Sequence, residues 1–368
     1  MIYNLFLTLF FIIVLSYTCC KKEVIQLPHI SQAKFEKTSF DKLNGFEKDD
    51  LKLAFKVFQK DCHKAIRYDN LKEICHKASE TSNFENFFQN NFTPYALIND
   101  DLSDEGIITG YYEPILKGSY QQNETFKYPV YATPKNLLTI DLSSLYPELS
   151  KYILRGKVVG NKVIPYSPRE NLEENEKEYL EPICYVDNKI DLFFMQIQGS
   201  GKVQLEDGSI INIGYAQQNG HPYYAIGRTL IENNFIAKED ISLQTIKQWL
   251  EENPEQIDAI LNLNPSYVFF HQSDKTATGS LGVELVANRN LAVDRKFIPL
   301  GFPVFIQTTD PLDNSPIQQL MVAGDTGGAI KGQIRADFFF GNGENAKEKA
   351  GKMKQKGKLF LLIPNNSL

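Results

Sequence analysis

Two aspartates on either side of a glycine-rich turn form the part of the sequence best suited to chemistry. In segment 325–341, DTGGAIKGQIRADFFFG, Asp325 precedes Gly327 and Gly328, and Asp337 directly precedes three phenylalanines. The phenylalanine run predicts a buried strand, and burial at its edge favours the protonated form of the Asp337 carboxyl group. A carboxyl group protonated near neutral pH can donate the proton that glycosidic bond cleavage needs. The alternative is that Asp325 belongs to an ordinary turn.

A third carboxylate, Asp294, lies in the short segment AVDR. Carboxylates at successive strand ends of a small barrel can converge on one cleft, although Asp294 could instead pair with Arg295 or cap a turn. No oxygen-rich metal loop, nucleotide-binding loop or Gly-x-Ser-x-Gly elbow is present. We therefore expect neither a metal nor a cofactor.

Two polar and aromatic stretches, 196–201 and 215–223, have the residue types of a polysaccharide groove. Amide side chains form paired hydrogen bonds, and tyrosine faces stack on sugar rings. The candidate substrate-binding residues in these stretches are Gln198, Gly199, Ser200, Tyr215, Asn219 and Tyr223. The alternative is a hydrogen-bonded network at strand ends with solvent-facing turns.

The composition is that of a globular protein, with 42% hydrophobic and 23% charged residues in a chain of 368. This length can hold two ordinary domains or one elaborated domain. The formal net charge of -6 argues against nonspecific nucleic-acid binding as the main role. We expect no nucleic-acid partner.

The first residues have the pattern of an export signal. The apolar run 5–15 is too short to span a bilayer confidently and has the length of a signal-peptide core. Cys19 follows it, with Cys20 as the second candidate, as in bacterial lipoproteins that are acylated on a new N-terminal cysteine. Residues 1–19 are thus a predicted signal peptide, and the polar residues 20–45 a predicted tether.

Three cysteines remain beyond that pair. In an exported protein, Cys62 and Cys75 could form a disulfide that closes a short loop. Because each is followed by histidine, a zinc site is the rival interpretation, but adjacent Cys-His pairs point to different faces of a helix. The disulfide is favoured, and Cys184 is a predicted buried free thiol.

Hydrophobic periodicity divides the chain into a helical unit followed by β-rich units. The glutamate-rich segment 169–181 is a predicted solvated loop. Helices are predicted near 51–62, 70–75, 82–88, 223–233, 243–252 and 254–261, and strands or hairpins at 107–112, 128–134, 192–198, 202–213, 267–270, 291–293, 304–307, 319–322 and 358–363.

Several ordered sequence blocks resemble the membrane-bound lytic murein transglycosylase A family. The blocks are GYYEP (110–114), YPVYATP (128–134), IPYSPRE (164–170), QIQGSG (196–201), GYAQQNGHPYYAIGR (214–228), NPSYVFF (264–270), GSLGVELVANRNLAVDRKFIPLG (279–301) and DTGGAIKG with its downstream Asp337. The resemblance runs from about residue 50 to the C-terminus. A chain of blocks in one order is far more specific than any single block.

The resemblance implies a fold that is mainly β with helices (α+β). A helical hairpin and a double-psi β-barrel would form the catalytic domain from residues 46–111 and 263–368. A second β-rich domain, residues 112–262, would be inserted, leaving a deep groove between the two. The implied reaction cleaves the β-1,4 bond between N-acetylmuramic acid and N-acetylglucosamine in peptidoglycan and leaves 1,6-anhydromuramoyl ends without consuming water.

The resemblance also implies roles for individual residues. Asp337 would act as acid and then as base, while Asp325 and Asp294 would stabilise positive charge. Tyr112, Gly327, Gly328 and Lys331 join the groove residues as substrate-binding candidates. The partners would be glycan strands and, through the lipid anchor, a membrane, most simply the outer membrane of a Gram-negative bacterium on its periplasmic side. The alternatives are a noncatalytic glycan-binding envelope protein and a hydrolytic glycosidase.

Overall fold

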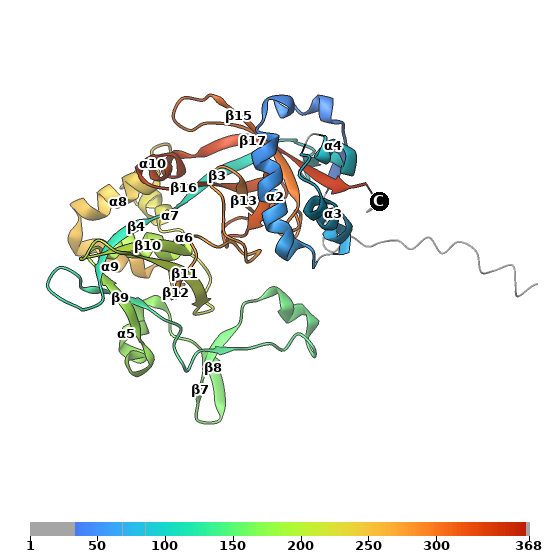
Figure 1. The fold of residues 1–368 in the computed structure, drawn as a ribbon. Helices are drawn as coiled ribbons and strands as arrows, with labels where there is room; N and C mark the ends of the chain where they lie inside the picture. Colours follow the sequence, from blue (N-terminus) through green and yellow to red (C-terminus); the bar gives the residue numbers. More distant parts are fainter. Residues whose placement is uncertain (1–33, 68, 85, 366–368) are drawn as a thin grey trace, which may run out of the picture.

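The computed structural model describes residues 34–67, 69–84 and 86–365 (Figure 1). The predicted signal peptide and lipidation site Cys19 lie outside the described residues. Within the described ranges the strands form three sheets, and sheets with accompanying helices make up the α+β fold expected from the sequence. No helix in these ranges is long and apolar enough to cross a membrane.

The largest sheet has eight strands and closes on itself. Its strands, in spatial order, are β1 (Lys34–Lys37), β2 (Phe92–Ile98), β17 (Lys354–Pro364), β14 (Pro303–Thr309), β15 (Pro316–Asp325), β13 (Asn290–Val293), β16 (Arg335–Asn342) and β3 (Gly106–Glu113). Because β17 also pairs with β3, the last six strands form a closed ring. A closed ring leaves no open edge between those six strands. The double-psi connection of the ring stays a prediction.

Apolar side chains from every strand of the ring meet in one core. The sequence sets this up, since β14, β16 and β17 each contain a run of buried apolar residues. Gly110 in β3 is required by close packing, because a Cβ atom there would lie 2.5 Å from the Phe340 ring. The tight contact holds β3 against its neighbour at the position of the candidate site.

Three N-terminal helices pack on this ring. They are α2 (Leu51–Ala65), which begins at the Asp50 cap, α3 (Asp69–Glu80) and α4 (Phe87–Asn91). Their aromatic contacts include Phe55 with Phe87, at 4.7 Å between ring centroids. Asp49 forms a buried ion pair with Arg289 at 2.8 Å and accepts a hydrogen bond from the backbone of Leu320 in β15. The helical unit is therefore attached to the C-terminal part of the chain.

Cys62 and Cys75 form the predicted disulfide between α2 and α3, and Cys184 is the predicted buried free thiol. We expect the double variant Cys62→Ser, Cys75→Ser to lose ~3 kcal/mol of unfolding free energy, because the unfolded chain regains the freedom of the closed loop. Urea denaturation measures this loss. A reductant should lower the parent's midpoint and leave that of the variant unchanged; equal midpoints for parent and variant would contradict the prediction.

The second sheet has six strands and lies between β3 and β13 in the chain. Its order is β12 (Val268–Ser273), β11 (Ile210–Gln218), β10 (Ser200–Leu205), β4 (Ile115–Ser119), β9 (Pro182–Val186) and β5 (Tyr128–Tyr131). The predicted hairpin between β10 and β11 is confirmed, with Gly208 at a positive φ in the turn. The domain boundary predicted at residue 262 had assigned residues 268–273 to the barrel. Because β12 pairs with β11, these residues belong to the second sheet instead.

The predicted strand 192–198 is wrong, because these residues lie in helix α6 (Lys189–Gln198). The Asn188 side chain caps its first turn, and Gly199 ends it with φ of +80°. The run looked like a buried strand because the helix is covered on two sides. Leu192 and Met195 pack on the second sheet, whereas Phe193 packs on the helices that follow.

Those following helices complete the same part of the chain. They are α7 (Gly227–Glu232), α8 (Leu243–Glu252), which starts in a capping box at Ser242, η7 (Pro254–Gln256) and α9 (Ile257–Asn262). One further helix, α10 (Glu344–Lys352), lies near the C-terminus and contacts β3 and β16. Figure 1 shows α8 and α10 on the same side of the molecule.

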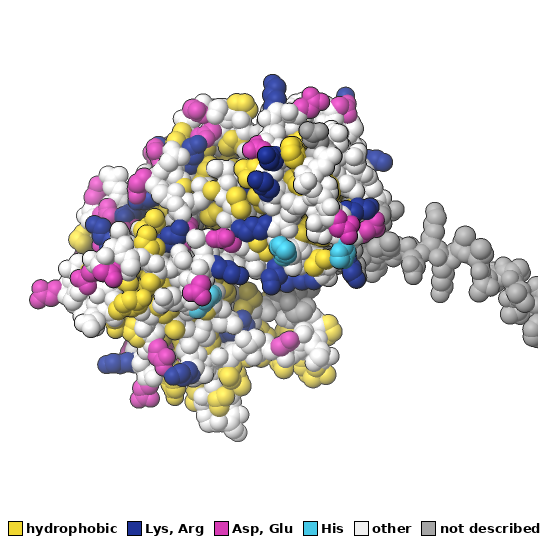
Figure 2. All heavy atoms as spheres, viewed as in Figure 1, with side chains coloured by type: hydrophobic (Ala, Val, Ile, Leu, Met, Phe, Trp, Pro, Cys, Tyr) yellow, Lys and Arg dark blue, Asp and Glu magenta, His cyan; other side chains and the backbone are white. Residues whose placement is uncertain are grey.

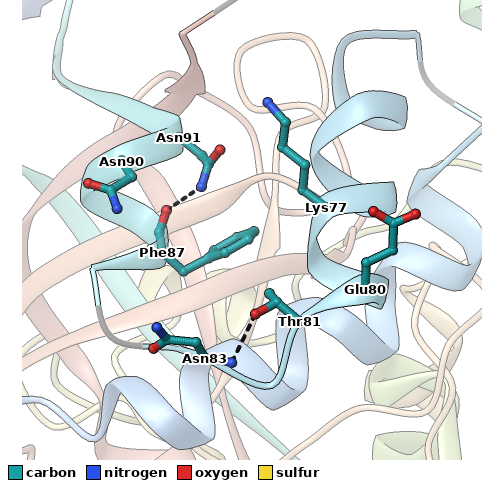
Figure 3. Close-up of a pocket in the computed structure, with 7 residues that line it drawn as sticks. All are labelled: Lys77, Glu80, Thr81, Asn83, Phe87, Asn90 and Asn91. Carbon is teal, nitrogen blue, oxygen red and sulfur yellow. Dashed lines mark hydrogen bonds between the residues drawn. The ribbon is translucent and has the colours of Figure 1, made fainter.

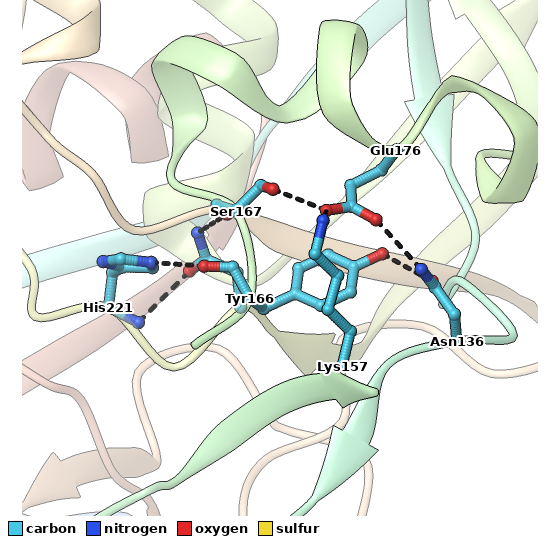
Figure 4. Close-up of polar contacts among 7 residues, drawn as sticks. Asn136, Lys157, Tyr166, Ser167, Glu176 and His221 are labelled. Carbon is cyan, nitrogen blue, oxygen red and sulfur yellow. Dashed lines mark hydrogen bonds and ion pairs between the residues drawn. The ribbon is translucent and has the colours of Figure 1, made fainter. Parts of the chain in front are cut away.

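A small third sheet projects from the second and is braced by a buried polar network. Its strands are β6 (Leu138–Thr139), β7 (Arg155–Val159) and β8 (Lys162–Pro165). Glu176 is 1% exposed and accepts hydrogen bonds from Lys157, Ser167 and Asn136 (Figure 4). Burial raises the pKa of Glu176, but these hydrogen bonds outweigh burial and the net pKa is lowered.

The structure contradicts two sequence predictions, the solvated loop at 169–181 and part of the N-terminal tether. Segment 169–181, predicted as a solvated loop, contains three short helices: η5 (Arg169–Asn171), α5 (Leu172–Asn175) and η6 (Lys177–Tyr179). It is not fully solvated, because Glu176 is buried and accepts the hydrogen bonds of this network. The tether prediction is wrong for residues 34–45. In that segment β1 pairs with β2, and the Phe35 ring packs edge-on against Tyr95 with 5.1 Å between ring centroids. Two short helices follow, η2 (Phe40–Lys42) and η3 (Phe46–Lys48).

Candidate active site

Asp337 lies within β16, between the two strands that flank it. Its register partners are Ala292 in β13 and Thr109 in β3. The Thr109 hydroxyl donates a hydrogen bond of 2.5 Å to Asp337 Oδ1 and accepts one of 2.9 Å from Arg335 Nη2. The hydrogen bond from Thr109 therefore fixes the orientation of Asp337, and Thr109 also links Asp337 to the positive charge of Arg335.

Burial raises the pKa of Asp337 to about 6. The Thr109 hydrogen bond and the Arg335 charge lower it, and the Asp325 charge raises it, but burial is the largest effect. The sequence expectation that the aromatic run would desolvate this carboxyl group is in the right direction. At a pH near 6 the group can both give and take a proton.

Asp325, at the end of β15, also has Ala292 as its register partner, on the other side of β13. Two strand spacings place the Cα atoms of Asp325 and Asp337 about 10 Å apart. Asp325 Oδ1 accepts hydrogen bonds of 2.8 Å from the backbone and hydroxyl of Ser280 and from the backbone of Thr326. Burial raises the pKa of Asp325 and these bonds oppose the rise.

Tyr111 is a hydrogen-bond donor to Asp325 and lies within the electrostatic influence of Asp337. Its hydroxyl donates a hydrogen bond of 3.2 Å to Asp325 Oδ2, and its ring packs on Phe339 at 5.0 Å. Burial and the charges of Asp325 and Asp337 together raise the pKa of Tyr111 well above its ordinary value. Tyr111 therefore stays a neutral donor at any physiological pH.

Asp294 is buried, with 5% of its surface exposed, and its carboxylate binds backbone groups. Oδ1 accepts from the backbone N–H of Lys296, and Oδ2 accepts from that of Gly332 at 3.1 Å. These contacts join the turn after β13 to the loop before β16, which is the arrangement of a turn-stabilising carboxylate. The structure brings Asp337 and Asp325 together and places Asp294 beside the loop that leads to Asp337.

Comparison with known proteins identifies the family. A family model described as the MltA specific insert domain matches residues 107–271, and one described as the 3D domain matches residues 289–363. Membrane-bound lytic murein transglycosylase A of Vibrio cholerae is 32% identical over 277 residues, which cover 73% of this chain and 68% of that protein. The chain belongs to the membrane-bound lytic murein transglycosylase A family.

Other relatives agree with this assignment. A homolog from Buchnera aphidicola is 35% identical over 264 residues, 69% of this chain and 65% of that protein, so the match spans slightly less than two thirds of its length. The crystal structure of the membrane-bound lytic murein transglycosylase from Agrobacterium tumefaciens has a TM-score of 0.81 at 30% identity, covering 91% of this chain and 98% of that one. The E. coli MltA structure with bound chitohexaose has a TM-score of 0.66 at 26% identity, covering 85% and 90%.

Within this MltA-family fold, the other predicted groove residues fall into exposed and buried sets. Tyr215 in β11 and Tyr223 are 46% and 42% exposed. Gly328 and Lys331 are exposed and Gly327 is half-buried, all in the loop between β15 and β16. Gln198, Gly199 and Ser200 are half-buried at the end of α6 and the start of β10. These residues are accessible to a ligand.

Tyr112 and Asn219 are buried instead. Tyr112 is 7% exposed and packs in the main core, on the opposite face of β3 from Tyr111, and its backbone N–H donates to Gln198. Asn219 is 1% exposed and donates through Nδ2 to the carbonyls of Ser167 and Pro265. Both link neighbouring segments of the protein.

Sequence reasoning missed Thr109, which bonds Asp337, Tyr111, which bonds Asp325, and Arg335, which bonds Thr109 and lowers the pKa of Asp337. The signal was present in the strand alternation, because residues 109 and 111 share one face of a strand and residue 112 takes the other. The cation that lowers the pKa of Asp337 is Arg335, two residues away on the same strand.

A separate pocket of about 340 Å³ lies between α3 and α4 (Figure 3). It is lined by residues of the N-terminal helical unit, among them Lys77, Glu80 and Phe87, and by none from the ring. Among the described residues that line it, Glu80 is the one carboxylate, so they do not offer the paired carboxylates of Asp337 and Asp325.

Proposed function

We propose that this protein is a lytic transglycosylase that cleaves the β-1,4 bond between N-acetylmuramic acid and N-acetylglucosamine in peptidoglycan and forms 1,6-anhydromuramoyl ends. The observation that carries the proposal is the environment of Asp337. A carboxyl group with a pKa of about 6, oriented by Thr109, has the proton affinity that acid–base catalysis near neutrality needs. Membership of the family supports the same conclusion.

In the first half of the reaction, protonated Asp337 gives its proton to the glycosidic oxygen of the leaving N-acetylglucosamine. The bond from that oxygen to C1 of N-acetylmuramic acid breaks, and positive charge develops at C1 and the ring oxygen. The Asp337 carboxylate then takes the proton of the C6 hydroxyl as its oxygen bonds to C1. The enzyme returns to its starting protonation state, and no water enters the product.

Asp325 stabilises the positive charge at C1 in this scheme. Asp325 and Asp337 share Ala292 as register partner. Hydrogen bonds from Ser280, Thr326 and Tyr111 hold the Asp325 carboxylate in place. Fixed charges act strongly in a site from which water is displaced, because they need no reorganisation during the reaction. Asp294 acts as a positioning residue for the loop that precedes β16.

The glycan strand follows the exposed polar and aromatic residues. Tyr215 and Tyr223 stack on sugar rings, and Gln198, Ser200, Lys331 and the loop glycines contact hydroxyl and amide groups. Tyr112 and Asn219 support this surface from behind. Figure 2 shows Lys and Arg side chains interspersed with Asp and Glu over the face in view. We place the protein at the envelope membrane, anchored through Cys19.

Mass spectrometry of purified murein after digestion in ¹⁸O-labelled water tests reaction and substrate together. We expect 1,6-anhydro muropeptides without label. Labelled reducing ends would indicate a hydrolytic glycosidase, and binding to murein without any product would indicate a glycan-binding protein. Either outcome contradicts the proposal.

The same assay has an expected pH dependence. Because Asp337 must be protonated at the start and its pKa is about 6, we expect kcat/KM to fall as pH rises through about 6, by roughly tenfold per unit above it. Rates measured on soluble glycan fragments between pH 5 and 8 report this limb. A rate that stays constant across the range would contradict Asp337 as the acid.

A further inference from the structure

Three side chains form a chain of hydrogen bonds on one face of strands β3 and β16. Arg335 lies two residues before Asp337 on β16, so both side chains project from the same face about 7 Å apart. Thr109, the register partner of Asp337 on β3, joins them. Its hydroxyl oxygen accepts from Arg335 Nη2 at 2.9 Å, and the hydroxyl donates to Asp337 Oδ1 at 2.5 Å.

Backbone contacts on both strands hold Arg335 in this position. Its Nη1 donates to the carbonyl of Ala336 at 2.6 Å and to that of Ile107, its register partner, at 3.4 Å. Within the described residues the terminal nitrogens of Arg335 bond these carbonyls and Thr109, and neither bonds the Asp337 carboxylate directly. The hydrogen-bonded route from Arg335 to Asp337 therefore passes through Thr109.

The direction of these bonds follows from the chemistry of the groups. A guanidinium group can only donate, so the Thr109 oxygen accepts from Arg335, and the single hydroxyl proton of Thr109 is directed to Asp337 Oδ1. Because Oδ1 already receives this proton, the acid form of Asp337 carries its own proton on Oδ2. After that proton has left, Oδ1 still receives the same hydrogen bond.

Asp337 Oδ2 is the oxygen that a ligand can reach. Among the described residues no group donates a hydrogen bond to it, and it is not one of the buried oxygens that lack a partner. The Asp337 side chain is half-buried, so part of its surface remains open. Oδ1 is held by the protein, and Oδ2 is free for a substrate.

We propose that Arg335 is a positioning residue: acting through Thr109, it confines the transferable proton to Asp337 Oδ2, so that one oxygen both gives and takes the proton. This role rests on the proposed function, because it concerns the same proton transfers. Without Arg335 the Thr109 hydroxyl is free to turn and to accept a proton from Asp337 Oδ1. The acid proton would then lie on the oxygen that a substrate does not meet.

The charges around Asp337 give the same groups a second, separable effect. Asp325 on β15 raises the pKa of Asp337, whereas the Thr109 hydrogen bond and Arg335 lower it; Tyr111 on β3 is neutral, and β13 has an alanine at this register position. Loss of the Thr109 hydroxyl or of the Arg335 charge should therefore move the falling limb of kcat/KM to higher pH.

Kinetics of full-length protein on soluble glycan fragments between pH 5 and 8 test the proposal. Thr109→Val keeps the side-chain shape and lacks the hydroxyl; we expect kcat at pH 5, where Asp337 is mostly protonated, to fall about tenfold with KM within about twofold. Arg335→Met should lower kcat at pH 5 about fivefold, and both variants should shift the limb upward. Thr109→Ser, which restores the hydroxyl, should keep kcat within about threefold of the parent.

The double variant Thr109→Val, Arg335→Met separates this route from a purely structural role. If Arg335 acts through Thr109, its loss in the Thr109→Val background should change kcat at pH 5 by less than about twofold. Lys354→Met is the matched control, because Lys354 is an exposed cation and the register partner of Thr109 on β17. It should keep the kcat and the limb of the parent.

Arg335→Gln replaces Arg335→Met if that variant does not fold, because the shorter amide also lacks the charge and the Nη2 donor. Parent-like kcat at pH 5 in Thr109→Val or in the Arg335 variant overturns the inference, as do additive losses in the double variant. An unshifted limb in Thr109→Val contradicts it as well. The proposed function fails separately, when the parent releases no anhydro muropeptides from murein.

Discussion

The Asp337→Asn variant is expected to lose release of 1,6-anhydro muropeptides by about 10⁴-fold. One carboxyl group performs both proton transfers in the proposed reaction, so its removal affects bond cleavage and ring closure together. Asparagine keeps the size and can still accept from the Thr109 hydroxyl, but it cannot exchange a proton. Quantified muropeptides from purified sacculi measure the loss.

This variant should fold as well as the parent, which separates catalysis from stability. Folding raises the pKa of Asp337 from 3.8 to about 6, so the free energy of unfolding falls as pH rises between these values and stays reduced above pH 6; asparagine removes that loss. We expect its melting temperature at pH 8 to be no lower than that of the parent. Asp313→Asn, at an exposed turn, is the matched control and should keep full activity. Turnover by Asp337→Asn within about tenfold of the parent would rule out Asp337 as the acid.

Asp325→Asn has the second largest expected effect, a loss of about 100-fold in kcat/KM. The variant lacks the charge that stabilises the cationic transition state, and fixed electrostatic groups in active sites contribute effects of this size. Its remaining carbonyl oxygen can keep the hydrogen bonds from Ser280 and Thr326, so the local fold should persist. Kinetics on soluble glycan fragments measure the change.

Asp325→Asn also has an expected signature in the pH profile. The Asp325 charge raises the pKa of Asp337, so removing it should shift the falling limb to lower pH. Ser280→Ala, which retains the charge and removes one hydrogen bond, should leave the limb near pH 6. A variant Asp325→Asn with at least half of the parent activity and an unshifted limb would contradict the role assigned to Asp325.

Local patterns in the sequence predicted the elements whose residues make most of their contacts within a short span. Helix α2, the hairpin of β10 and β11, helix α8 and the Cys62–Cys75 disulfide all agree with the structure. Helix α6 did not follow this rule. It is apolar on two sides because the sheet and the helices of the same part of the chain both cover it, so its sequence lacks the periodicity of a surface helix.

The sequence by itself indicated the candidate reactive group, an aspartate against a buried aromatic strand, and the family that its ordered blocks resemble. Only the tertiary structure decided which groups surround it. Asp325 and Asp337 lie at one register position, on either side of Ala292, because Ala292 pairs with both. Thr109 and Tyr111 reach them from more than 200 residues away. Strand register depends on these long-range pairings, so no local pattern could have placed Tyr111 beside the carboxylates and Tyr112 in the core.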